Sequence, residues 1–316
     1  MISRVYAAGA RFRRQYYCRR PYLQHRLSRP VISIGNLAVG GRAKTPMAAL
    51  VAERLRARGE RPAILSRGYA RRDAADGVVV VRDPNGIRAD LDRAGDEPLM
   101  LARRLDGVAV LAASSRYLAG CLAERHFGCT VHILDDGFQH FDLHRDADLV
   151  LVAAEDLANG ATLPGGRLRE PIDAASAADA FVALDGANVA RLAGGRPVWT
   201  GRRMLGKVPR GPALAVAGIA NPQGFFEAIR AAGCTVAGEM RFADHHPYSR
   251  EDLTRISDRA RSSGAITVVT TEKDLIRLLP FRPFPMPIVA ATMTLEIDDA
   301  VAFDAWLADT IERARA

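Results

Sequence analysis

A lysine–threonine pair at the end of a glycine-rich stretch is the first group of residues in this sequence that could do chemistry. Residues 40–46 read GGRAKTP. In a phosphate-binding loop the glycines let backbone N–H groups surround phosphates, the lysine reaches the terminal phosphates and the hydroxyl holds Mg²⁺. Lys44 and Thr45 fit the last two roles, but Ala43 stands where such loops carry glycine. The stretch therefore predicts a phosphate-binding loop altered at its tip, with an ordinary turn as the alternative.

The surroundings of this stretch favour the phosphate-binding loop. Apolar residues 31–34 predict a strand, and residues 45–58 predict a helix with Pro46 in its first turn, where a missing N–H does no harm. A strand, a glycine-rich loop and a helix in that order present a helix N-terminus to an anion. Ala43 supports the alternative, because alanine resists the positive φ angles that glycine adopts.

Two adjacent carboxylates end a later apolar run, in the stretch ILDDGFQH. Asp135 and Asp136 follow the expected strand 130–134. Alone, an aspartate pair before glycine indicates a turn. In proteins with a phosphate-binding loop, a carboxylate at the end of such a strand holds Mg²⁺ directly or through water. With Lys44 and Thr45 upstream, we interpret the pair as a metal-binding group.

Three more polar stretches could take part in the same chemistry. Asp96 in AGDEPLML could cap a helix, or accept the proton of a substrate hydroxyl. His245 in RFADHHPYS could lie in a polar loop, or pair with a carboxylate across a cleft as a general base. Glu170 and the arginines beside it in LPGGRLREP suit a metal and an anionic phosphate, or a surface loop.

The pattern of apolar segments predicts what positions these residues. Between residues 31 and 152 short apolar runs alternate with helical patterns, which predicts an α/β fold with a P-loop NTPase-like, mostly parallel sheet and helices on both faces. The expected strands are 31–34, 63–65, 78–81, 108–112, 130–134 and 149–152, and the expected helices are 45–58, 97–105 and 115–127. The polar stretches follow strand ends, where ligands bind in such sheets.

A second, smaller α/β unit is predicted downstream. Residues 153–210 are rich in Ala, Gly and Arg and show no clear pattern. From residue 213 the alternation resumes, with strands expected at 213–217, 235–240, 266–270 and 287–291 and helices at 222–231, 249–262, 272–279 and 301–313. We therefore divide the chain into an N-terminal arm at 1–30, a P-loop core domain at 31–205 and a smaller C-terminal α/β domain at 206–316.

The N-terminal arm carries the net charge. The chain has 316 residues and a net charge of +8, and its first 30 residues hold eight arginines and no acidic residue, so the rest carries 36 basic and 36 acidic residues. Read as a helix that ends before Pro21, the arm is amphipathic and places Ile2, Val5, Phe12 and Tyr16 on one side. This suits an anionic membrane surface, with packing on its own domain as the alternative. No nucleic-acid partner is expected, because no such motif follows.

The remaining composition is that of a soluble protein, 48% hydrophobic and 25% charged, and a cytosolic location is expected. No run approaches the roughly 18 apolar residues of a membrane-spanning helix, and no signal peptide is expected. The four cysteines form no C-x-x-C pair, so reduced thiols are expected rather than a disulfide or zinc framework.

These stretches together resemble one family, the tetraacyldisaccharide 4'-kinases, or lipid A 4'-kinases. The matching motifs are VISIGNLAVGG, KTP, ILSRGY, GDEP, SSRY, DDGFQH, LPGGRLREP, DHHPY and TTEKD, in the family's order and over nearly the whole chain. The resemblance implies a P-loop kinase that moves the γ-phosphate of ATP to the 4'-hydroxyl of a tetraacylated glucosamine disaccharide 1-phosphate in lipid A biosynthesis. It implies a peripheral enzyme, expected as a monomer, that meets the cytoplasmic face of the bacterial inner membrane through its N-terminal arm.

The resemblance also implies roles for individual residues. ATP would be bound by the glycine-rich loop and one glutamine, namely Gly40, Gly41, Arg42, Ala43, Lys44, Thr45 and Gln139. Mg²⁺ would be held by one hydroxyl and three carboxylates, namely Thr45, Asp135, Asp136 and Glu170. A dyad of Asp96 and His245 would activate the acceptor hydroxyl, and Arg116 would steady the phosphates or the transition state. His245 is preferred to His246 because the family pattern fixes the first histidine more firmly.

One departure from the family pattern keeps other functions open. The family usually has GGTGKTP where this chain has GGRAKTP, so Arg42 and Ala43 stand in place of threonine and glycine. Either the loop keeps its shape with Ala43 strained by roughly 1 kcal/mol, or it is distorted and binds nucleotide weakly. The alternatives are a metal-dependent phosphoesterase, suggested by DHHPYS and DDGFQHFDLHRDAD, and a membrane-surface nucleotide- or lipid-binding protein without turnover.

Overall fold

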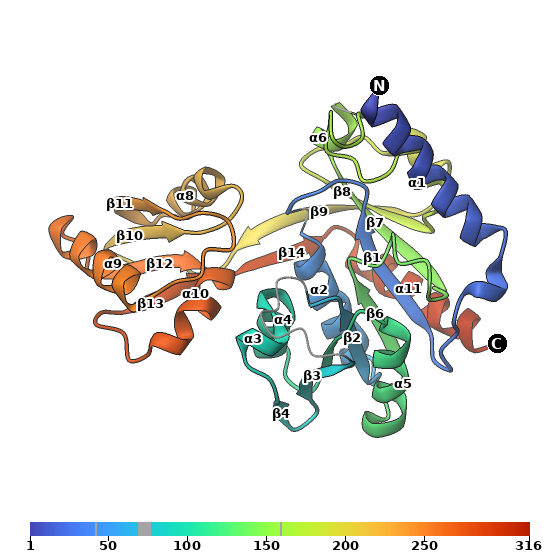
Figure 1. Ribbon diagram of the computed structural model, residues 1–316, viewed down its shortest axis with the longest axis horizontal. Helices are drawn as coiled ribbons and strands as arrows, with labels where there is room; N and C mark the ends of the chain where they lie inside the picture. Colours follow the sequence, from blue (N-terminus) through green and yellow to red (C-terminus); the bar gives the residue numbers. More distant parts are fainter. Residues whose placement is uncertain (42, 69–76, 159) are drawn as a thin grey trace.

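The computed structural model describes the whole chain except residues 42, 69–76 and 159. The described residues form a large unit around a ten-stranded sheet and a smaller unit around a four-stranded sheet (Figure 1). Strands β9 and β14 reach from the large sheet toward the smaller unit, and the N-terminal helix α1 lies along the opposite side of the large unit.

The central strands of the large sheet are parallel. Its strands in spatial order are β14 (Met293–Ile297), β9 (Val198–Leu205), β8 (Ala180–Leu184), β7 (Ala147–Ala153), β1 (Val31–Asn36), β6 (Val131–Asp135), β2 (Pro62–Ser66), β5 (Ala109–Ala112), β3 (Val79–Asp83) and β4 (Gly86–Ile87). From β9 to β5 each neighbour pairs in parallel. The strands β14, β3 and β4 pair antiparallel at the two edges. The mostly parallel sheet predicted from the sequence is confirmed.

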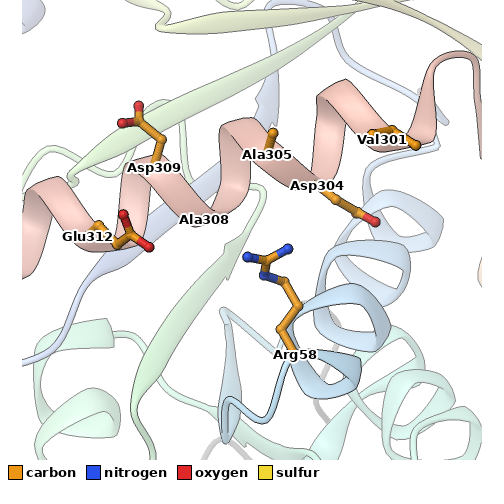
Figure 2. A pocket seen from close by; sticks show the side chains of 7 residues that line it. All are labelled: Arg58, Val301, Asp304, Ala305, Ala308, Asp309 and Glu312. Atoms are coloured by element: carbon orange, nitrogen blue, oxygen red, sulfur yellow. The ribbon is translucent and has the colours of Figure 1, made fainter.

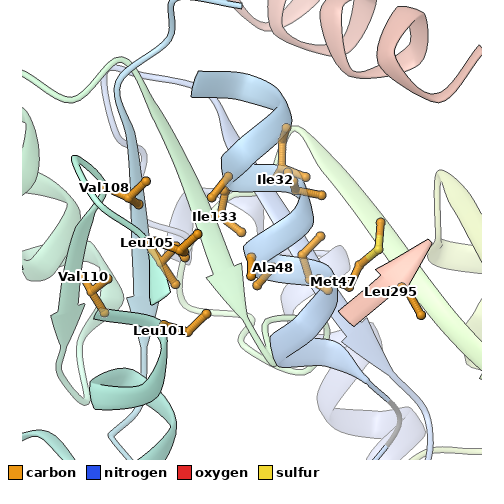
Figure 3. Close-up of a cluster of buried hydrophobic side chains, with 14 of the residues drawn as sticks. Ile32, Met47, Ala48, Leu101, Leu105, Val108, Val110, Ile133 and Leu295 are labelled. Carbon is orange, nitrogen blue, oxygen red and sulfur yellow. The ribbon is translucent and has the colours of Figure 1, made fainter. Parts of the chain in front are cut away.

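Helices cover both faces of this sheet. One face is covered by α2 (Lys44–Ala57), α4 (Asp96–Arg104) and α11 (Ala300–Arg315), and the other by α5 (Arg116–Phe127), η2 (Ile172–Ala177) and α7 (Ala190–Ala193). Successive residues of a strand point to opposite faces. Along β6, Ile133 therefore joins the cluster under α2, whereas Leu134 joins the cluster under α5. Figure 3 shows Ile32 and Ile133 of the sheet packed against Met47 of α2.

The smaller unit has an all-parallel sheet. Its strands in spatial order are β11 (Thr235–Arg241), β10 (Pro212–Ala217), β12 (Thr267–Thr271) and β13 (Ile288–Ala291), and its helices are α8 (Pro222–Ala231), α9 (Arg250–Ser262) and α10 (Glu272–Leu278). These elements lie within one residue of their expected bounds. Short helical segments complete the chain, namely η1 (Pro21–Leu23), α3 (Leu91–Ala94), α6 (Ala154–Ala158) and η3 (Leu279–Phe281).

The chain does not divide at residue 206 as the sequence pattern led us to expect. After β9 it leaves the large sheet, forms the smaller unit and returns with β14, which pairs antiparallel with β9. Helix α11 then buries Phe303 and Leu307 in the core of the large unit, where Leu295 of β14 also lies (Figure 3). The last strand and helix therefore belong to the large unit. The strand β14 was not among the expected strands, and a local alternating pattern does not show which sheet a strand joins.

The N-terminal helix α1 (Ile2–Cys18) packs on the large unit by its arginine side. Arg14 is the buried residue of this helix. The apolar side predicted from the sequence instead faces outward, since Ile2, Val5 and Phe12 are 71%, 69% and 70% exposed. No helix of the described residues is long and apolar enough to cross a membrane. The helix therefore presents uncovered apolar side chains at the surface.

The C-terminal end of α11 is tied to the large unit by an ion pair. Arg315 donates to both carboxylate oxygens of Glu60, at 2.9 and 2.7 Å, and the Thr130 hydroxyl donates a further bond at 2.5 Å. The bonds from Arg315 are the main cause of a lowered pKa at Glu60, and they outweigh the opposing effect of burial. The folded state therefore favours the ionised carboxylate, and this stabilisation is lost as the pH falls.

We expect Glu60→Gln to lower the free energy of unfolding by about 1 kcal/mol at pH 7, a modest value because Arg315 is partly exposed. The difference should shrink as the pH falls below the ordinary value of 4.5, because Glu60 then takes up a proton in the unfolded chain while it stays ionised in the native protein, down to its lowered native pKa. Urea unfolding from pH 7 to about pH 3.5 measures it, with Glu312→Gln on the exposed side of α11 as control. A difference that stays constant over this range would contradict the prediction.

Candidate active site

The glycine-rich loop joins the end of β1 to the start of α2. Lys44 is the first residue of α2, and its ammonium group donates to Oδ1 of Asn36 at the end of β1, at 3.1 Å. It also lies 3.6 Å from Oδ1 of Asp136. Thr45 is buried beside it. The structure thus brings three predicted residues together, and it adds Asn36, which the sequence analysis did not single out.

The backbone of the loop turns where the sequence has glycine. Gly40 has a φ of 105°, and a Cβ atom there would lie 2.6 Å from Nη2 of Arg167, so the position favours glycine. Around Gly41 there is open space. Arg42, which the resemblance assigns to ATP binding, lies outside the described residues. Ala43 has φ 55° and ψ 26°, the left-handed turn that a glycine would form without strain.

Backbone strain gathers at the predicted site residues. Among described residues other than glycine, φ is positive at Ala43, Asp136 and His245, and elsewhere only at Asp185 and Asp299. Such conformations cost about 1–2 kcal/mol for a residue with a Cβ atom, and they cluster at functional sites. The loop therefore keeps its turn with Ala43 strained, the first of the two outcomes considered from the sequence.

We expect Ala43→Gly to change the free energy of unfolding by less than about 1 kcal/mol, because relief of strain is offset by a freer unfolded chain and a lost buried methyl group. Ala43→Val should lower it by more than about 2 kcal/mol, because a β-branched residue is disfavoured in the left-handed region. Urea unfolding of both variants beside the native protein measures this. Equal stability of the valine variant and the native protein would show that the loop does not hold this turn.

The two aspartates at the end of β6 differ in their environment. Burial, together with the nearby Glu97 and Asp136, raises the pKa of Asp135 to about 7. Burial also acts to raise the pKa of Asp136, but Lys44 and Arg169 outweigh it and the pKa is lowered. Arg169 donates to both oxygens of Asp136, at 2.9 and 2.8 Å. A cation beside Asp135 would favour its ionised form.

A glutamine and a glutamate connect this region to helix α1. Gln139 donates from Nε2 to the backbone oxygen of Asn36 at 3.0 Å and to Oε2 of Glu170 at 3.1 Å. Glu170 accepts two further bonds from Arg14 of α1, at 2.9 and 2.6 Å, and the guanidinium of Arg14 lies over the ring of Phe138. Both oxygens of Glu170, a predicted metal ligand, are thus already engaged. In this structure Glu170 anchors α1.

Among the remaining predicted site residues, Asp135 and Gln139 carry oxygen atoms that suit Mg²⁺. Oδ1 of Asp135 and Oε1 of Gln139 are buried without a hydrogen-bond partner among the described residues. Mg²⁺ takes oxygen ligands and is usually held by one or two carboxylates together with substrate phosphates. The described part of the chain contains no group of three or more His, Cys, Asp or Glu that could hold a metal by itself. Thr45 and Asp135 therefore fit a magnesium ion shared with a phosphate substrate, whereas both oxygens of Asp136 are engaged by Arg169, as those of Glu170 are by Arg14.

The predicted acid–histidine pair forms between the two units. Asp96 is the first residue of α4, and His245 lies in the loop between β11 and α9. Oδ2 of Asp96 and Nδ1 of His245 are 3.0 Å apart. Nε2 of His246 is instead 3.0 Å from Oδ2 of Asp252 within the smaller unit. The geometry therefore favours His245 over His246 as the partner of Asp96.

Arg116 is a buried cation with weak partners. It is the first residue of α5 and is 5% exposed. Its Nη1 atom is 3.5 Å from the Ser114 carbonyl and 3.4 Å from Nδ1 of His140, and its Nε atom has no partner in the described chain. Burial, and next the charge of Arg67, lowers the pKa of Arg116 to about 10. Burial lowers the pKa of His140 to about 4, so its ring is neutral at pH 7. A guanidinium in this position suits an anionic phosphate.

Comparison with known proteins decides the family. The family model described as tetraacyldisaccharide-1-P 4'-kinase (LpxK) matches residues 1–312. The chain belongs to this family. The tetraacyldisaccharide 4'-kinase of Geobacter metallireducens is 38% identical over 317 residues, covering 95% of this chain and 93% of the relative. That of Pelobacter propionicus is 40% identical over 297 residues, covering 88% and 82%.

A solved structure supports the same assignment. LpxK from Aquifex aeolicus, described as an "apo" form in complex with ATP, matches with a TM-score of 0.80 at 30% identity and covers 98% of this chain and 97% of that one. The resemblance recognised from the motifs is confirmed, and the phosphoesterase alternative is not favoured. This chain is a lipid A 4'-kinase, and it carries the loop sequence GGRAKTP.

Two further residues of the 4'-kinase site were missed by sequence reasoning. Arg277 of α10 contacts both Asp96 and His245. Lys273 of the same helix donates to Oε1 of Glu97 at 2.5 Å. Their signal was available, because they lie in or just after the TTEKD motif at a spacing of four, which places both on one face of a helix. A pocket of about 300 Å³ opens beside Asp96, His245 and Arg277 at the junction of the units.

A second hollow lies far from this site. Arg58, just after the end of α2, lies across it from α11, whose Asp304, Asp309 and Glu312 line it (Figure 2). Lys44 is at the other end of α2, whose 14 residues span about 21 Å. The matched motifs of the 4'-kinase do not line the hollow, and we assign it no role.

Proposed function

We propose that this 4'-kinase uses ATP and Mg²⁺ to phosphorylate the 4'-hydroxyl of a tetraacylated glucosamine disaccharide 1-phosphate, and that the transfer takes place between its two units. The observation that carries the proposal is the 3.0 Å contact of Asp96 with His245, which adds a residue of the smaller unit to the unit that holds the phosphate-binding loop. The relative from Aquifex aeolicus is described in complex with ATP, which supports ATP as the donor here.

The large unit binds the phosphates. Lys44 and the backbone N–H groups at the N-terminus of α2 lie against the phosphates of ATP, because the first N–H groups of a helix have no partner within it. Thr45 and Asp135 would hold Mg²⁺, with Asp136 beside them paired to Arg169. When bound, Mg²⁺ neutralises charge on the phosphate oxygens and helps to hold them in place. Arg116 stabilises the charge that remains on the transferred group.

The pair between the units activates the acceptor. Asp96 accepts the Nδ1–H of His245, so that Nε2 receives the proton of the 4'-hydroxyl. The hydroxyl oxygen forms a bond to the γ-phosphorus, the bond from that phosphorus to the β–γ bridging oxygen breaks, and ADP leaves with the electron pair. Asp96 stabilises the imidazolium that His245 becomes.

Helix α1 is the part of the enzyme that meets the membrane. Its uncovered side carries Val5 and Phe12, and its exposed residues include Arg4 and Arg13. Apolar and basic side chains together suit a surface of anionic lipid. The Arg14–Glu170 ion pair fixes the helix to the large unit with its apolar side outward. We therefore place the enzyme on the cytoplasmic face of the bacterial inner membrane, as a peripheral monomer beside its acylated substrate.

Phosphate transfer from labelled ATP to a tetraacyl disaccharide 1-phosphate, in detergent with Mg²⁺, tests the proposal. Labelled lipid is the expected product of the native enzyme. Saturable ATP binding without a lipid product would indicate a nucleotide-binding protein that does not turn over. Release of phosphate from the lipid without ATP would indicate a phosphoesterase. Either of these outcomes would overturn the proposal.

A further inference from the structure

Arg277 stands behind the Asp96–His245 pair and contacts both of its members. The Nε and Nη2 atoms of Arg277 donate to Oδ2 of Asp96, with Nε at 3.0 Å. Nη2 also lies 3.1 Å from Nδ1 of His245. The side chains of Arg277 and Asp96 are 5% and 7% exposed. Three polar groups from α4, α10 and the loop after β11 therefore meet within hydrogen-bond distance, with the guanidinium and the carboxylate nearly buried and the imidazole 33% exposed.

The guanidinium is held from behind by a buried network of the smaller unit. Nη1 of Arg277 donates to the backbone oxygen of Gly218 at 3.1 Å and to Oδ1 of Asp274 at 3.3 Å. Asp274 is fully buried and also accepts from the Tyr248 hydroxyl at 3.1 Å and the Gly218 N–H at 3.0 Å. A Cβ atom at Gly218 would lie 2.9 Å from Oδ1 of Asp274, so glycine permits this close approach. The contacts with Gly218 and Asp274 therefore fix the direction of the guanidinium without any bound substrate.

The hydrogen bonds that hold Arg277 also restrict how Asp96 and His245 can lie against each other. Asp96 and His245 belong to different units, so their contact needs a group that fixes one against the other. A guanidinium only donates hydrogen bonds, and a carboxylate oxygen can accept from Arg277 and from the Nδ1–H of His245 at once. A fixed donor on Oδ2 fixes the carboxylate, and the carboxylate orients the imidazole and sets which ring nitrogen carries the hydrogen.

We propose that Arg277 is a positioning residue of phosphate transfer, which holds Asp96 and His245 in the arrangement that receives the hydroxyl proton. The inference rests on the proposed function of that pair. Arg277 acts through Asp96 and His245 and does not itself touch the reacting atoms.

A purely structural role would make a different prediction, because the same face of α10 also docks the smaller unit on the large one. Lys273 pairs with Glu97 of α4, and Ile276 is buried in the apolar core of the large unit. Lys273, Ile276 and Arg277 share one helix face at spacings of three and four. Ile276 contributes apolar packing to this docking and no polar group to the pair. It is therefore the matched control for Arg277.

Variants of Arg277 and of Ile276 distinguish a role in positioning the Asp96–His245 pair from a role in docking the smaller unit. Arg277→Lys keeps the charge but loses the planar fork of donors. We expect its kcat to fall on the order of 10- to 100-fold, with the KM for ATP within about threefold of native and a melting temperature near the native one. Arg277→Met, which also removes the charge, should lower kcat further. Ile276→Ala should lower the melting temperature by several degrees and keep kcat within about threefold of native wherever it is folded.

Nitrogen NMR of isotope-labelled histidine supplies a readout that does not depend on catalysis, with His245 assigned through His245→Gln. Both Arg277 variants should shift the ring-nitrogen resonances of His245, and Ile276→Ala should leave them in place. Native kcat and native resonances in folded Arg277→Met would overturn the proposal. A fall in kcat that Ile276→Ala reproduces would also overturn it. If Arg277→Met does not fold, Arg277→Lys decides between the same outcomes.

The two proposals can fail separately. A native enzyme without phosphate transfer would refute the proposed function. The His245 resonances of the Arg277 variants would still show whether Arg277 holds the pair, and unchanged resonances would refute the positioning role on their own.

Discussion

Asp96→Asn is expected to lower the kcat of phosphate transfer by about 10²- to 10⁴-fold, with little change in the KM for ATP. The amide keeps the size of the side chain but lacks the charge that stabilises a protonated His245, to which Asp96 is bonded at 3.0 Å. The phosphate-binding loop around Lys44 is left intact, so nucleotide affinity should be retained. Initial rates of labelled lipid formation at saturating ATP measure the effect.

Asp309→Asn is the matched control for this variant. Asp309 is a carboxylate on α11 that pairs with Arg313 at the surface and is 64% exposed, and its variant should keep the native kcat. Asp96→Asn also deprives the buried Arg277 of one of its two counter-charges, the other being Asp274, so thermal unfolding of the variant has to be recorded beside its rate. A folded Asp96→Asn enzyme with native kcat would refute the role of Asp96.

The double variant Val5→Ser, Phe12→Ser is expected to weaken binding to vesicles of anionic phospholipid by roughly a hundredfold or more. Burying these two side chains in lipid contributes about 3 kcal/mol, and each 1.4 kcal/mol is a tenfold change in the partition coefficient. Sedimentation with phosphatidylglycerol-containing vesicles at a fixed salt concentration measures the change. Transfer to substrate dispersed in detergent should stay near native, because neither side chain belongs to the site.

Ile266→Ser, Val301→Ser is the control for the membrane prediction, because these side chains are 63% and 81% exposed and lie outside α1. It removes similar apolar surface and should leave vesicle binding unchanged. If both double variants bind vesicles like the native protein, α1 is not the membrane-binding element. If both weaken binding equally, general surface hydrophobicity accounts for it.

Most helices and strands could be predicted because their signals are local. Helix α2 begins and ends within one residue of its expected bounds, since apolar spacing and Pro46 in the first turn mark it. The strand β14 was not predicted, and neither was its sheet, because Thr294 lies opposite Met204, 90 residues earlier, and no local pattern shows such a partner. The sequence did not show which side of α1 packs on the large unit, for a related reason. Arg14 is buried only because Glu170 is there to pair with it.

The residues of the candidate site likewise divide into those that the sequence could group and those that it could not. The residues of the phosphate site could be grouped because loops at the ends of neighbouring parallel strands share one edge of a sheet, namely Lys44, Thr45, Asp135 and Asp136. Asp96 and His245 are 149 residues apart, and it was the family resemblance that pointed to their pairing. The TTEKD motif pointed to the face of α10 that carries Arg277, but the contacts of Arg277 with the pair arise only when α10 docks on α4.

The segments that complete the large unit, β14 and α11, are synthesised after the whole of the smaller unit. They supply an edge strand of its sheet and the side chains of Phe303 and Leu307 to the core around α2. Until they emerge, the nascent chain exposes the apolar surface that they cover, and the loop at Lys44 rests on an unfinished core. The smaller unit has its own sheet and is synthesised earlier. Nucleotide binding is therefore acquired only after β14 and α11 have been synthesised and have packed on the large unit.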